Sequence, residues 1–547
     1  MTFSWLTALA VLPAIGAVVV LLSGQRLAKQ VALAASVITF GLAVIIAVQF
    51  RPGAGLQFAE QVRWIKPLGA YYALGLDGIG LTLVLLVVIV TPVVIIASWR
   101  DFELPEQSDA LAEAMDAGPP TGQSLRDEER GERKTTGSGD ASEKLPPKFG
   151  SSVFFALVLA VETSALFLFL ATDVFLFYVF FEVILIPMYF LIGGFGPGPR
   201  RTYAAAKFLI FGLLGGFVML ASVIGLYVQS AKVGEASYLL STLSQLDYGS
   251  NTERWLFLGF MFAFAIKAPL VPLHTWLPDA AEESSPGGAT MMVGVMDKIG
   301  TFGMIRFCHG LFPEASQWAT PAVLILATIS IIYGAVLAIG SRDLMRFIAY
   351  TSISHFGFIV LGIFAFTSQS LVGSTLYMLN HGLSTAALFV AAGYLIKRRG
   401  SRDMNAYGGV QKVAPVLAGL LLFAGLSTLS LPGLSSFVSE FMVLAGTFSR
   451  HPGYAVVSTL AIVLAALYIL IMYQRTMTGP VTPEVADTVT DLNPRERFAM
   501  APLILLIVVL GVFPKPMLSV IEPTVKASME HVGVTDPQPR VSAEGGR

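Results

Sequence analysis

Four charged side chains lie inside segments of this chain that are otherwise apolar enough to cross a lipid bilayer. They are Glu182, Lys267, Lys298 and Glu440. A charge at the centre of a bilayer costs about 2.5 to 3.5 kcal/mol on insertion scales, so such residues usually mark an ion or proton path. Because both signs are present, we expect side chains that exchange protons inside the membrane.

The prolines near these charges support the same interpretation. Pro269 and Pro272 cannot donate a backbone hydrogen bond, and each frees a carbonyl oxygen close to Lys267. Pro432, followed by Gly433, interrupts the last of the four segments. In lipid, a broken helix is tolerated where it lines protein or a water-filled cavity, and in transporters it marks the transport site. A fixed structural ion pair is the alternative explanation, and the helix breaks favour transport over it.

The composition indicates a membrane protein and excludes several other classes. Of 547 residues, 55% are hydrophobic and 13% charged, and the mean hydropathy is +0.72. A net charge of -1 gives no sign of a nucleic-acid partner, and the one cysteine excludes an internal disulfide or an iron–sulfur cluster. The six histidines lack the spacing of a metal site, and no glycine-rich nucleotide loop is present. Any redox chemistry must therefore take place on a partner.

Apolar segments of helix length predict an all-α polytopic membrane protein with about 14 transmembrane helices. The breaks fall in the seventh and twelfth spans, five spans apart. This spacing predicts two inverted five-helix repeats, spans 4–8 and 9–13. Most Lys and Arg of the short loops lie on one side of the membrane, which places both termini outside.

These predictions divide the chain into five parts. They are residues 1–99 with helices 1–3, a long hydrophilic cytoplasmic loop at 100–150, a first repeat at 151–308, a second repeat at 319–475, and residues 476–547 with a loop, helix 14 and a short tail. The segment at 411–449 is too long for one crossing, and we interpret it as one helix broken in the middle. The tail after Pro514 contains several prolines and is not expected to form a long lateral helix.

Several long motifs in the chain resemble a known family. They are LGLDGIGLTL, FFEVILIPMYFLIG, AIKAPLVPLHTWLPDA, DKIGTFGMIRF, SISHFGF, LNHGLSTAALF and LPGLSSFVSEF. The motifs resemble those of the antiporter-like membrane subunits of respiratory complex I, over about residues 70 to 475. A glutamate in the twelfth span is typical of the chain M type in that family, so Glu440 favours this type.

The chain departs from the family pattern at three places. Ala281 replaces the usual histidine after LPDA, although Glu283 keeps the acid that follows. Asp297 places a carboxylate before Lys298, where an apolar residue is common. The loop at 100–150 is also longer than expected.

The resemblance implies a role for each candidate residue. In the family, charged residues form a hydrated axis through the membrane interior. Here Glu182 would pair with Lys267, Lys298 would lie in the middle, and Glu440 would end the axis. His355 and His381 would act as relays between the last two. Secondary positions are Glu162, Lys207, His274 and Glu283. Because burial favours neutral forms and an opposite charge favours ionised ones, the Glu–Lys pair would act as a switch.

The resemblance also implies a setting for the chain. It would be a proton-translocating subunit of a bacterial NADH-quinone oxidoreductase in the cytoplasmic (inner) membrane, an enzyme only as part of that complex. We expect no cofactor and no metal on this chain, with NADH, FMN, iron–sulfur clusters and quinone on other subunits. The expected partners are antiporter-like chains L and N, small membrane chains and the lipid bilayer, with no nucleic acid. The alternatives are a subunit of an Mrp-type sodium/proton antiporter or of a membrane-bound hydrogenase.

Overall fold

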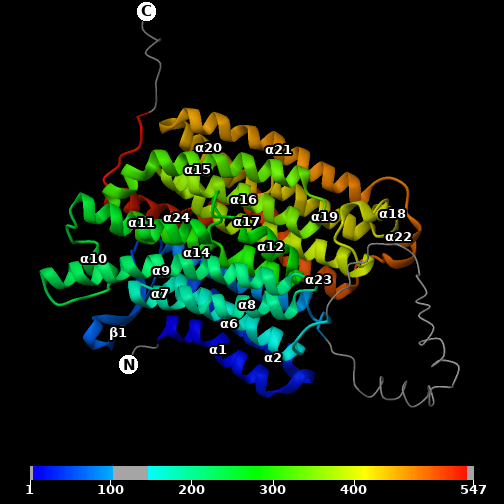
Figure 1. Cartoon of the computed structure of the whole chain (residues 1–547), viewed down its shortest axis with the longest axis horizontal. Helices are drawn as coiled ribbons and strands as arrows, with labels where there is room; N and C mark the ends of the chain where they lie inside the picture. Colours follow the sequence, from blue (N-terminus) through cyan, green and yellow to red (C-terminus); the bar gives the residue numbers. More distant parts are fainter. Residues whose placement is uncertain (1–3, 103–145, 539–547) are drawn as a thin grey trace, which may run out of the picture.

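The computed structural model describes residues 4–102 and 146–538, which fold into a bundle of helices that run side by side (Figure 1). One end of the bundle carries the β1–β2 hairpin and α10, and we name it the hairpin end. The opposite end carries α18 and α22. Most of residues 100–150 lie outside the described ranges.

Long helices make up most of the bundle. They are α1 (Trp5–Leu22), α2 (Gly24–Gln49), α3 (Gly78–Ala97), α6 (Ser151–Leu170), α9 (Arg201–Val233), α15 (Pro313–Gly340), α16 (Leu344–Phe364), α17 (Ser368–Arg399), α21 (Pro452–Met477) and α23 (Pro494–Val512). Shorter helices complete it: α7 (Val174–Val183), α8 (Leu185–Phe195), α10 (Leu240–Leu243), α11 (Ser250–Lys267), α12 (Trp276–Glu283), α13 (Pro286–Ala289), α14 (Lys298–Gly303), α18 (Val410–Val413), α19 (Pro415–Thr428), α20 (Ser435–Arg450), α22 (Pro483–Thr488) and α24 (Lys515–Val532).

Ten helical segments in the described ranges are long and apolar enough to span a membrane: α1, α2, α3, α6, α7 together with α8, α9, α15, α16, α17 and α21. The number is eleven if the bent pair α23 and α24 forms one span. The chain is therefore a helical, multi-pass membrane protein. Other spans expected from the sequence, at 255–275, 286–308 and 411–449, are interrupted and do not form single long helices. The innermost helices, α16 and α17, are buried on nearly all sides, as expected for apolar helices without a polar face.

The two breaks expected from proline are present. Between α11 and α12, residues 268–275 leave the helix, and the backbone N–H of Val271 donates instead to Ser330 Oγ on α15 at 2.9 Å. The carbonyl oxygen of Ile266 accepts from the indole of Trp276 at 3.0 Å. Between α19 and α20, the turn contains Ser430 with a positive φ of 61°. The first break is thus stabilised by specific partners.

A third irregular helix was not expected. The segment that carries Lys298 begins as α13, continues as a π-helix η2 (Thr290–Met296), becomes α14, and ends as a second π-helix η3 (Met304–His309). A π-helical turn shifts the backbone hydrogen bonds by one residue, and such turns are frequent at functional sites. Lys298 lies at the join between η2 and α14.

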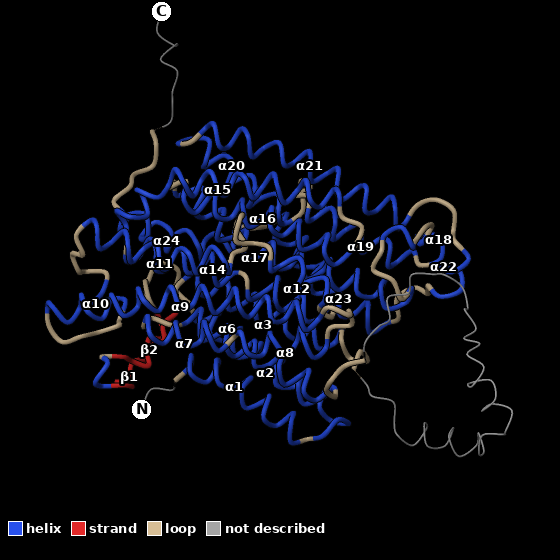
Figure 2. Tube along the Cα trace, in the orientation of Figure 1, coloured by secondary structure: helices blue, strands red, loops and turns tan. Residues whose placement is uncertain are grey.

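A small sheet departs from the all-α prediction. Strands β1 (Gln57–Ile65) and β2 (Ala70–Leu76) pair antiparallel, with Val62 opposite Tyr72, and are joined by the 3-10 turn η1 (Lys66–Leu68). They are the red segments at the hairpin end in Figure 2. Gly69 closes the turn with a φ of 62°, a conformation that favours glycine.

The C-terminal segment also differs from the expected short tail. Residues after Pro514 form α24, an 18-residue helix bent by 70° from α23. It lies across the hairpin end, where Thr524 Oγ1 accepts from Gly78 N at 3.1 Å and Val532 O accepts from Gln317 at 3.1 Å. The prolines do not prevent this helix, because Pro516 lies in its first turn and only Pro523 lies inside it. A second 3-10 turn, η4 (Met404–Ala406), follows α17 at the opposite end.

Candidate functional site

The six principal candidate residues lie on six elements that follow one another across the bundle. In Figure 1, α7 lies in the lower part of the molecule, α11 and α14 above it, α17 and α16 further up, and α20 near the top, so the elements succeed one another roughly at right angles to the direction of the helices. Contacts join α11 to α14, η2 to α17, and α17 to both α16 and α20. A row of side chains can therefore cross the molecule within the plane of the membrane.

Lys298 and His381 form the centre of this row. Lys298 is fully buried, and its Nζ lies 2.8 Å from His381 Nδ1 on α17. The same Nζ donates to the carbonyl oxygen of Val293 at 2.6 Å. Because Val293 belongs to η2, the π-helical turn presents an acceptor to the lysine. The ring of Phe356 covers the ammonium group at 5.1 Å.

His355 continues the row from His381. The two imidazole rings lie 5.4 Å apart, centroid to centroid, and both residues are buried. On its other side, His355 Nδ1 lies 2.7 Å from the hydroxyl oxygen of Tyr377. The Nε2 atoms of both histidines have no hydrogen-bond partner within the described ranges.

Glu440 ends the row. Its Oε2 accepts hydrogen bonds from the Tyr377 hydroxyl at 2.7 Å and from Ser430 Oγ at 2.6 Å. The side chain is buried, with 5% of the residue exposed. Lys298, His381, His355, Tyr377 and Glu440 thus form a series, which we name the relay: hydrogen bonds join every neighbouring pair except the two histidines, whose rings lie side by side.

Lys267 lies at the last residue of α11, beside the break. It is buried, and its Nζ makes no hydrogen bond to any described residue. The ammonium group faces the ring of Phe181 at 4.6 Å. Phe181 neighbours Glu182 on α7, so the lysine faces the helix that carries the expected carboxylate.

Glu182 does not form the expected ion pair with Lys267 in this structure. Neither carboxylate oxygen of Glu182 has a hydrogen-bond partner in the described part of the chain. The two charges act on each other without direct contact. Glu182 instead lies against Gly216 of α9, where an added Cβ would meet its Oε1 at 1.5 Å. Gly216 therefore provides the space for the carboxylate.

Two of the secondary candidates belong to a charged network at the end opposite the hairpin. Lys207 of α9 pairs with Asp279 of α12 at 2.7 Å, and Arg346 of α16 contacts both Asp279 and Glu282. Burial alone would raise the pKa of Asp279. Lys207 opposes this effect by its hydrogen bond and its charge, and Arg346 opposes it by its charge, so the pKa lies below its ordinary value of 3.8. Glu283 accepts from the backbone N–H of Arg200 at 3.1 Å. This network joins α9, α12 and α16.

The other two secondary candidates are buried but stand apart from the relay. His274 lies in the break after α11, with its ring 5.3 Å from that of Tyr333 and its Nδ1 without a partner among the residues described. Because the helix does not continue past Lys267, His274 does not share a helix face with it. Glu162 of α6 is fully buried, and its oxygens accept no hydrogen bond from the described residues.

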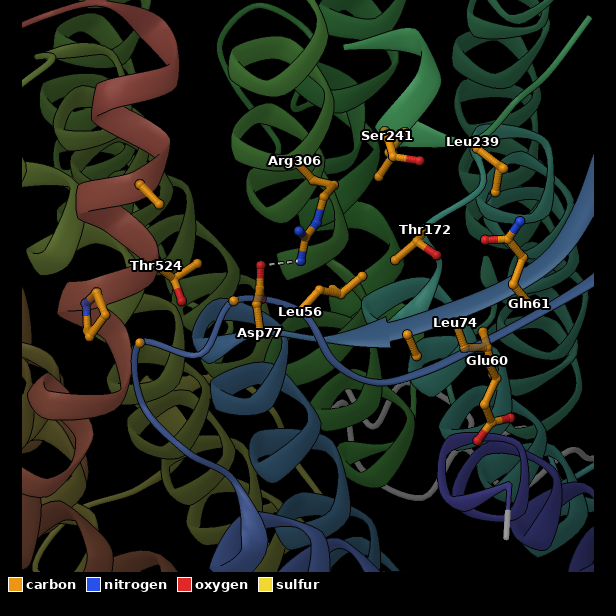
Figure 3. Close-up of a pocket in the computed structure, with 16 residues that line it drawn as sticks. Leu56, Glu60, Gln61, Leu74, Asp77, Thr172, Leu239, Ser241, Arg306 and Thr524 are labelled. Atoms are coloured by element: carbon orange, nitrogen blue, oxygen red, sulfur yellow. Dashed lines mark ion pairs between the residues drawn. The ribbon is translucent and has the colours of Figure 1, made fainter. Parts of the chain in front are cut away.

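A cavity of about 380 Å³ opens at the hairpin end, away from the relay (Figure 3). It lies between the hairpin and α24, and Arg306 pairs with Asp77 at its wall at 2.8 Å. None of the relay residues lines it. Within residues 4–102 and 146–538, no group of three or more His, Cys, Asp or Glu side chains could hold a metal ion.

Sequence reasoning missed Tyr377 and Ser430. Neither is charged, and an isolated tyrosine or serine in an apolar segment is usual in packed helices. One signal was available: Tyr377 precedes His381 by four residues, so both lie on one face of the same helix. Ser430 lies in the turn before Pro432, where its side chain can reach back to α20 only because of the break.

The chain is similar to proteins of known type over nearly its whole length. Residues 171–465 match the family described as NADH:quinone oxidoreductase/Mrp antiporter, TM. NADH-quinone oxidoreductase subunit M of Mycobacterium tuberculosis (strain H37Rv) is 49% identical over 548 residues, which cover 98% of this chain and 96% of that protein.

Two solved structures have the same fold. A chain of respiratory complex I from Thermus thermophilus matches with a TM-score of 0.82 and 28% identity, over 97% of this chain and 100% of that one. A chain of the Mrp complex from Dietzia sp. DQ12-45-1b matches with a TM-score of 0.78 and 19% identity, over the same shares of the two chains. At that identity the second match shows the fold alone.

Proposed function

Since this chain belongs to the transmembrane family of NADH:quinone oxidoreductases and Mrp antiporters, and within it to the subunit M type, we propose that its relay carries protons between Lys298 and Glu440. The chain is a proton-translocating membrane-arm subunit of an NADH-quinone oxidoreductase. What needs an explanation is how the side chains described above perform this task.

The hydrogen bonds of the relay have a consistent direction. Lys298 can donate only, so His381 Nδ1 accepts and its Nε2 carries the proton. Tyr377 donates its one proton to Glu440, so His355 Nδ1 carries a proton and its Nε2 is an acceptor. The two free Nε2 atoms are therefore a donor and an acceptor in neighbouring rings. This complementarity is the observation that supports the proposal most strongly.

A proton moves along the relay by one transfer at each contact. Lys298 passes a proton to His381 Nδ1, and His381 releases the proton on Nε2 toward His355. His355 passes its Nδ1 proton to the Tyr377 oxygen, while Tyr377 passes its own proton to Glu440. Each group ends with as many protons as before, except that Lys298 has lost one and Glu440 has gained one.

Glu182 and Lys267 form the controlling end of this pathway. When the carboxylate approaches Lys267, it favours the protonated ammonium; when the carboxylate withdraws, burial favours the neutral amine and the proton leaves. The separation of the two groups in this structure, with space for Glu182 beside Gly216, is compatible with such movement. Redox chemistry in partner subunits supplies the driving force.

Replacement of Tyr377 by Phe tests the relay directly. The variant keeps the ring and loses only the hydroxyl that links His355 to Glu440. We expect proton pumping to fall at least about tenfold, because a positioned proton carrier contributes about 10² to 10⁴ in rate. The measurement is proton uptake per NADH oxidised in membrane vesicles that contain the assembled complex.

Ser430→Ala is the matched control for this variant. It also removes a hydroxyl that hydrogen-bonds Glu440, but Ser430 makes no contact with His355. Pumping should remain close to wild type. Equal pumping by wild type, Tyr377→Phe and Ser430→Ala would exclude Tyr377 from the path and contradict the proposed direction of transfer.

We also propose an orientation and an assembly for the chain. We place the hairpin end and both termini outside and the charged network of Lys207, Asp279 and Arg346 inside, in the inner membrane of a bacterium. The interrupted segments complete fourteen spans, with 151–308 and 319–475 as inverted repeats.

Antiporter-like chains L and N and small membrane chains are the proposed neighbours. NADH, FMN, iron–sulfur clusters and quinone belong to other subunits of the complex. The antiporter alternative has weaker support, since the likeness to the Mrp chain shows the fold alone.

A further inference from the structure

Asp297 is a buried titratable residue that the relay does not use. The residue is fully buried, and neither carboxylate oxygen has a hydrogen-bond partner in the described part of the chain. An unpaired carboxyl group inside a membrane protein is costly and calls for a functional or structural reason. The position of Asp297, between Lys267 and Lys298, indicates a functional one.

The packing of α14 against α11 places Asp297 near Lys267. An added Cβ at Gly300 would lie 2.6 Å from the backbone nitrogen of Ala268, so this face of α14 touches the end of α11. Asp297 precedes Gly300 by three residues, about one helical turn, and so lies on the same face. Lys267, the last residue of α11, immediately precedes Ala268.

Lys298 projects from a different face of the same segment. Its Nζ contacts His381 on α17, and neighbouring residues in a helix project about 100° apart. Asp297 therefore faces the helix of Lys267, and Lys298 faces the relay. The charges of both lysines act on the Asp297 carboxylate.

From this arrangement we infer that Asp297 carries the proton from Lys267 to Lys298, a step that rests on the proposed function. An N–H bond of the Lys267 ammonium breaks and an O–H bond forms on Asp297, which leaves a neutral amine and a carboxylic acid. The O–H bond then breaks as the proton passes to Nζ of Lys298, which has already given its own proton to His381. The carboxylate is restored, and no further reactant is needed.

A carboxylate at this position also lowers the electrostatic cost of the pathway. Two buried ammonium groups repel each other, and a negative charge between them offsets the repulsion. With Asp297 ionised, the charges of Glu182, Lys267, Asp297 and Lys298 alternate in sign.

The test compares Asp297→Asn with Asp297→Glu in vesicles that contain the assembled complex. Asparagine keeps the size of the side chain but cannot carry a proton, whereas glutamate can. We expect protons pumped per NADH oxidised to fall at least about tenfold in Asp297→Asn and to be retained largely in Asp297→Glu. Redox-triggered infrared difference spectra should show a protonated-carboxyl band that is lost in Asp297→Asn and shifted in Asp297→Glu.

Wild-type pumping and an unchanged infrared spectrum in Asp297→Asn would overturn the inference. Tyr377→Phe, measured in parallel, separates this failure from that of the proposed function. If Tyr377→Phe is impaired and Asp297→Asn is normal, only the role of Asp297 is wrong. If both pump normally, the relay itself is wrong. Should Asp297→Asn fail to assemble, an unshifted carboxyl band in Asp297→Glu would overturn the inference instead.

Discussion

At the scale of the residue, the buried groups fall into two sets with different hydrogen bonding. Lys298, His355 and Glu440 each contact a relay partner at 2.7 or 2.8 Å, so protons can pass between fixed atoms. Glu182 and Lys267 have no hydrogen-bond partner among the described residues. In a low dielectric, an unpaired ionisable group interacts strongly with nearby charges, so its protonation state changes when a nearby charge moves. The first set is suited to conduction, and the second to control.

Gly216→Ala tests the controlling set without changing a titratable group. The new methyl group would occupy the place of the Glu182 carboxylate, so the flexible side chain must move. We expect the complex to assemble and the rate of pumping to change by several-fold, since the interaction of Glu182 with Lys267 depends on their separation. Proton uptake in vesicles measures the effect.

Gly234→Ala provides the comparison for this substitution, because an added Cβ there meets no atom within 4 Å. Its pumping should equal that of wild type. If Gly216→Ala also pumps at the wild-type rate, the position of Glu182 does not control transfer.

At the scale of the element, Lys267, Lys298 and Ser430 lie where regular helices are interrupted. Lys267 ends α11 at a break, Lys298 lies between two π-helical turns, and Ser430 lies in the turn between α19 and α20. An interruption exposes backbone carbonyl and N–H groups, as at Val293, whose oxygen accepts from Lys298. The irregular backbone thus supplies carbonyl and N–H groups that, in a regular helix, would be hydrogen-bonded to one another.

The sequence was sufficient for some of these elements and insufficient for others. Proline marked the breaks after Lys267 and near Ser430, because it cannot donate a backbone hydrogen bond. No residue type marks a π-helix, so the turns around Lys298 could not be predicted. The hairpin and α24 were missed because membrane-scale hydropathy does not detect short or amphipathic elements outside the bilayer. Tyr377 was missed because its role depends on contacts between α16, α17 and α20.

Gly300→Ala tests the packing of α14 against α11. The added methyl group would lie 2.6 Å from the backbone nitrogen of Ala268 and 2.7 Å from the backbone oxygen of Phe264, which cannot move away as a side chain can. We expect a loss of stability of about 1 to 3 kcal/mol, typical of overpacking. The melting temperature of the complex in detergent gives the measurement.

The control is Gly294→Ala in η2, where the nearest atom to an added Cβ is Gly382 O at 3.7 Å. It should be tolerated. Equal melting temperatures for the two variants would show that the close contact at Gly300 is not a constraint.

At the scale of the whole molecule, the charged network joins the two proposed repeats. Asp279 belongs to the first, Arg346 to the second, and Lys207 completes the cluster. The pKa of Asp279 lies below its ordinary value, so the folded state favours its ionised form. The ionised carboxylate therefore stabilises the folded protein at pH values above the ordinary pKa of 3.8. This stabilisation is lost as the pH falls through the lower pKa that Asp279 has in the folded protein.

Asp279→Asn should therefore destabilise the complex at neutral pH and less so in acid. We expect a loss of about 1 kcal/mol near pH 7, because the residue is partly buried and its charged hydrogen bonds are partly screened. Melting temperatures of wild type and variant should converge as the pH falls below 3.8, toward the lowered pKa of Asp279. A difference independent of pH would mean that the ionised carboxylate is not what joins the repeats.

The proton-to-electron ratio of Lys298→Met tests most directly whether protons cross the membrane arm through these buried side chains. Methionine is an unbranched side chain one atom shorter than lysine, and it removes the charge and the transferable protons. In vesicles with the fully assembled complex, we expect Lys298→Met to lose the pumping that is coupled to NADH oxidation. A ratio equal to that of wild type would contradict it.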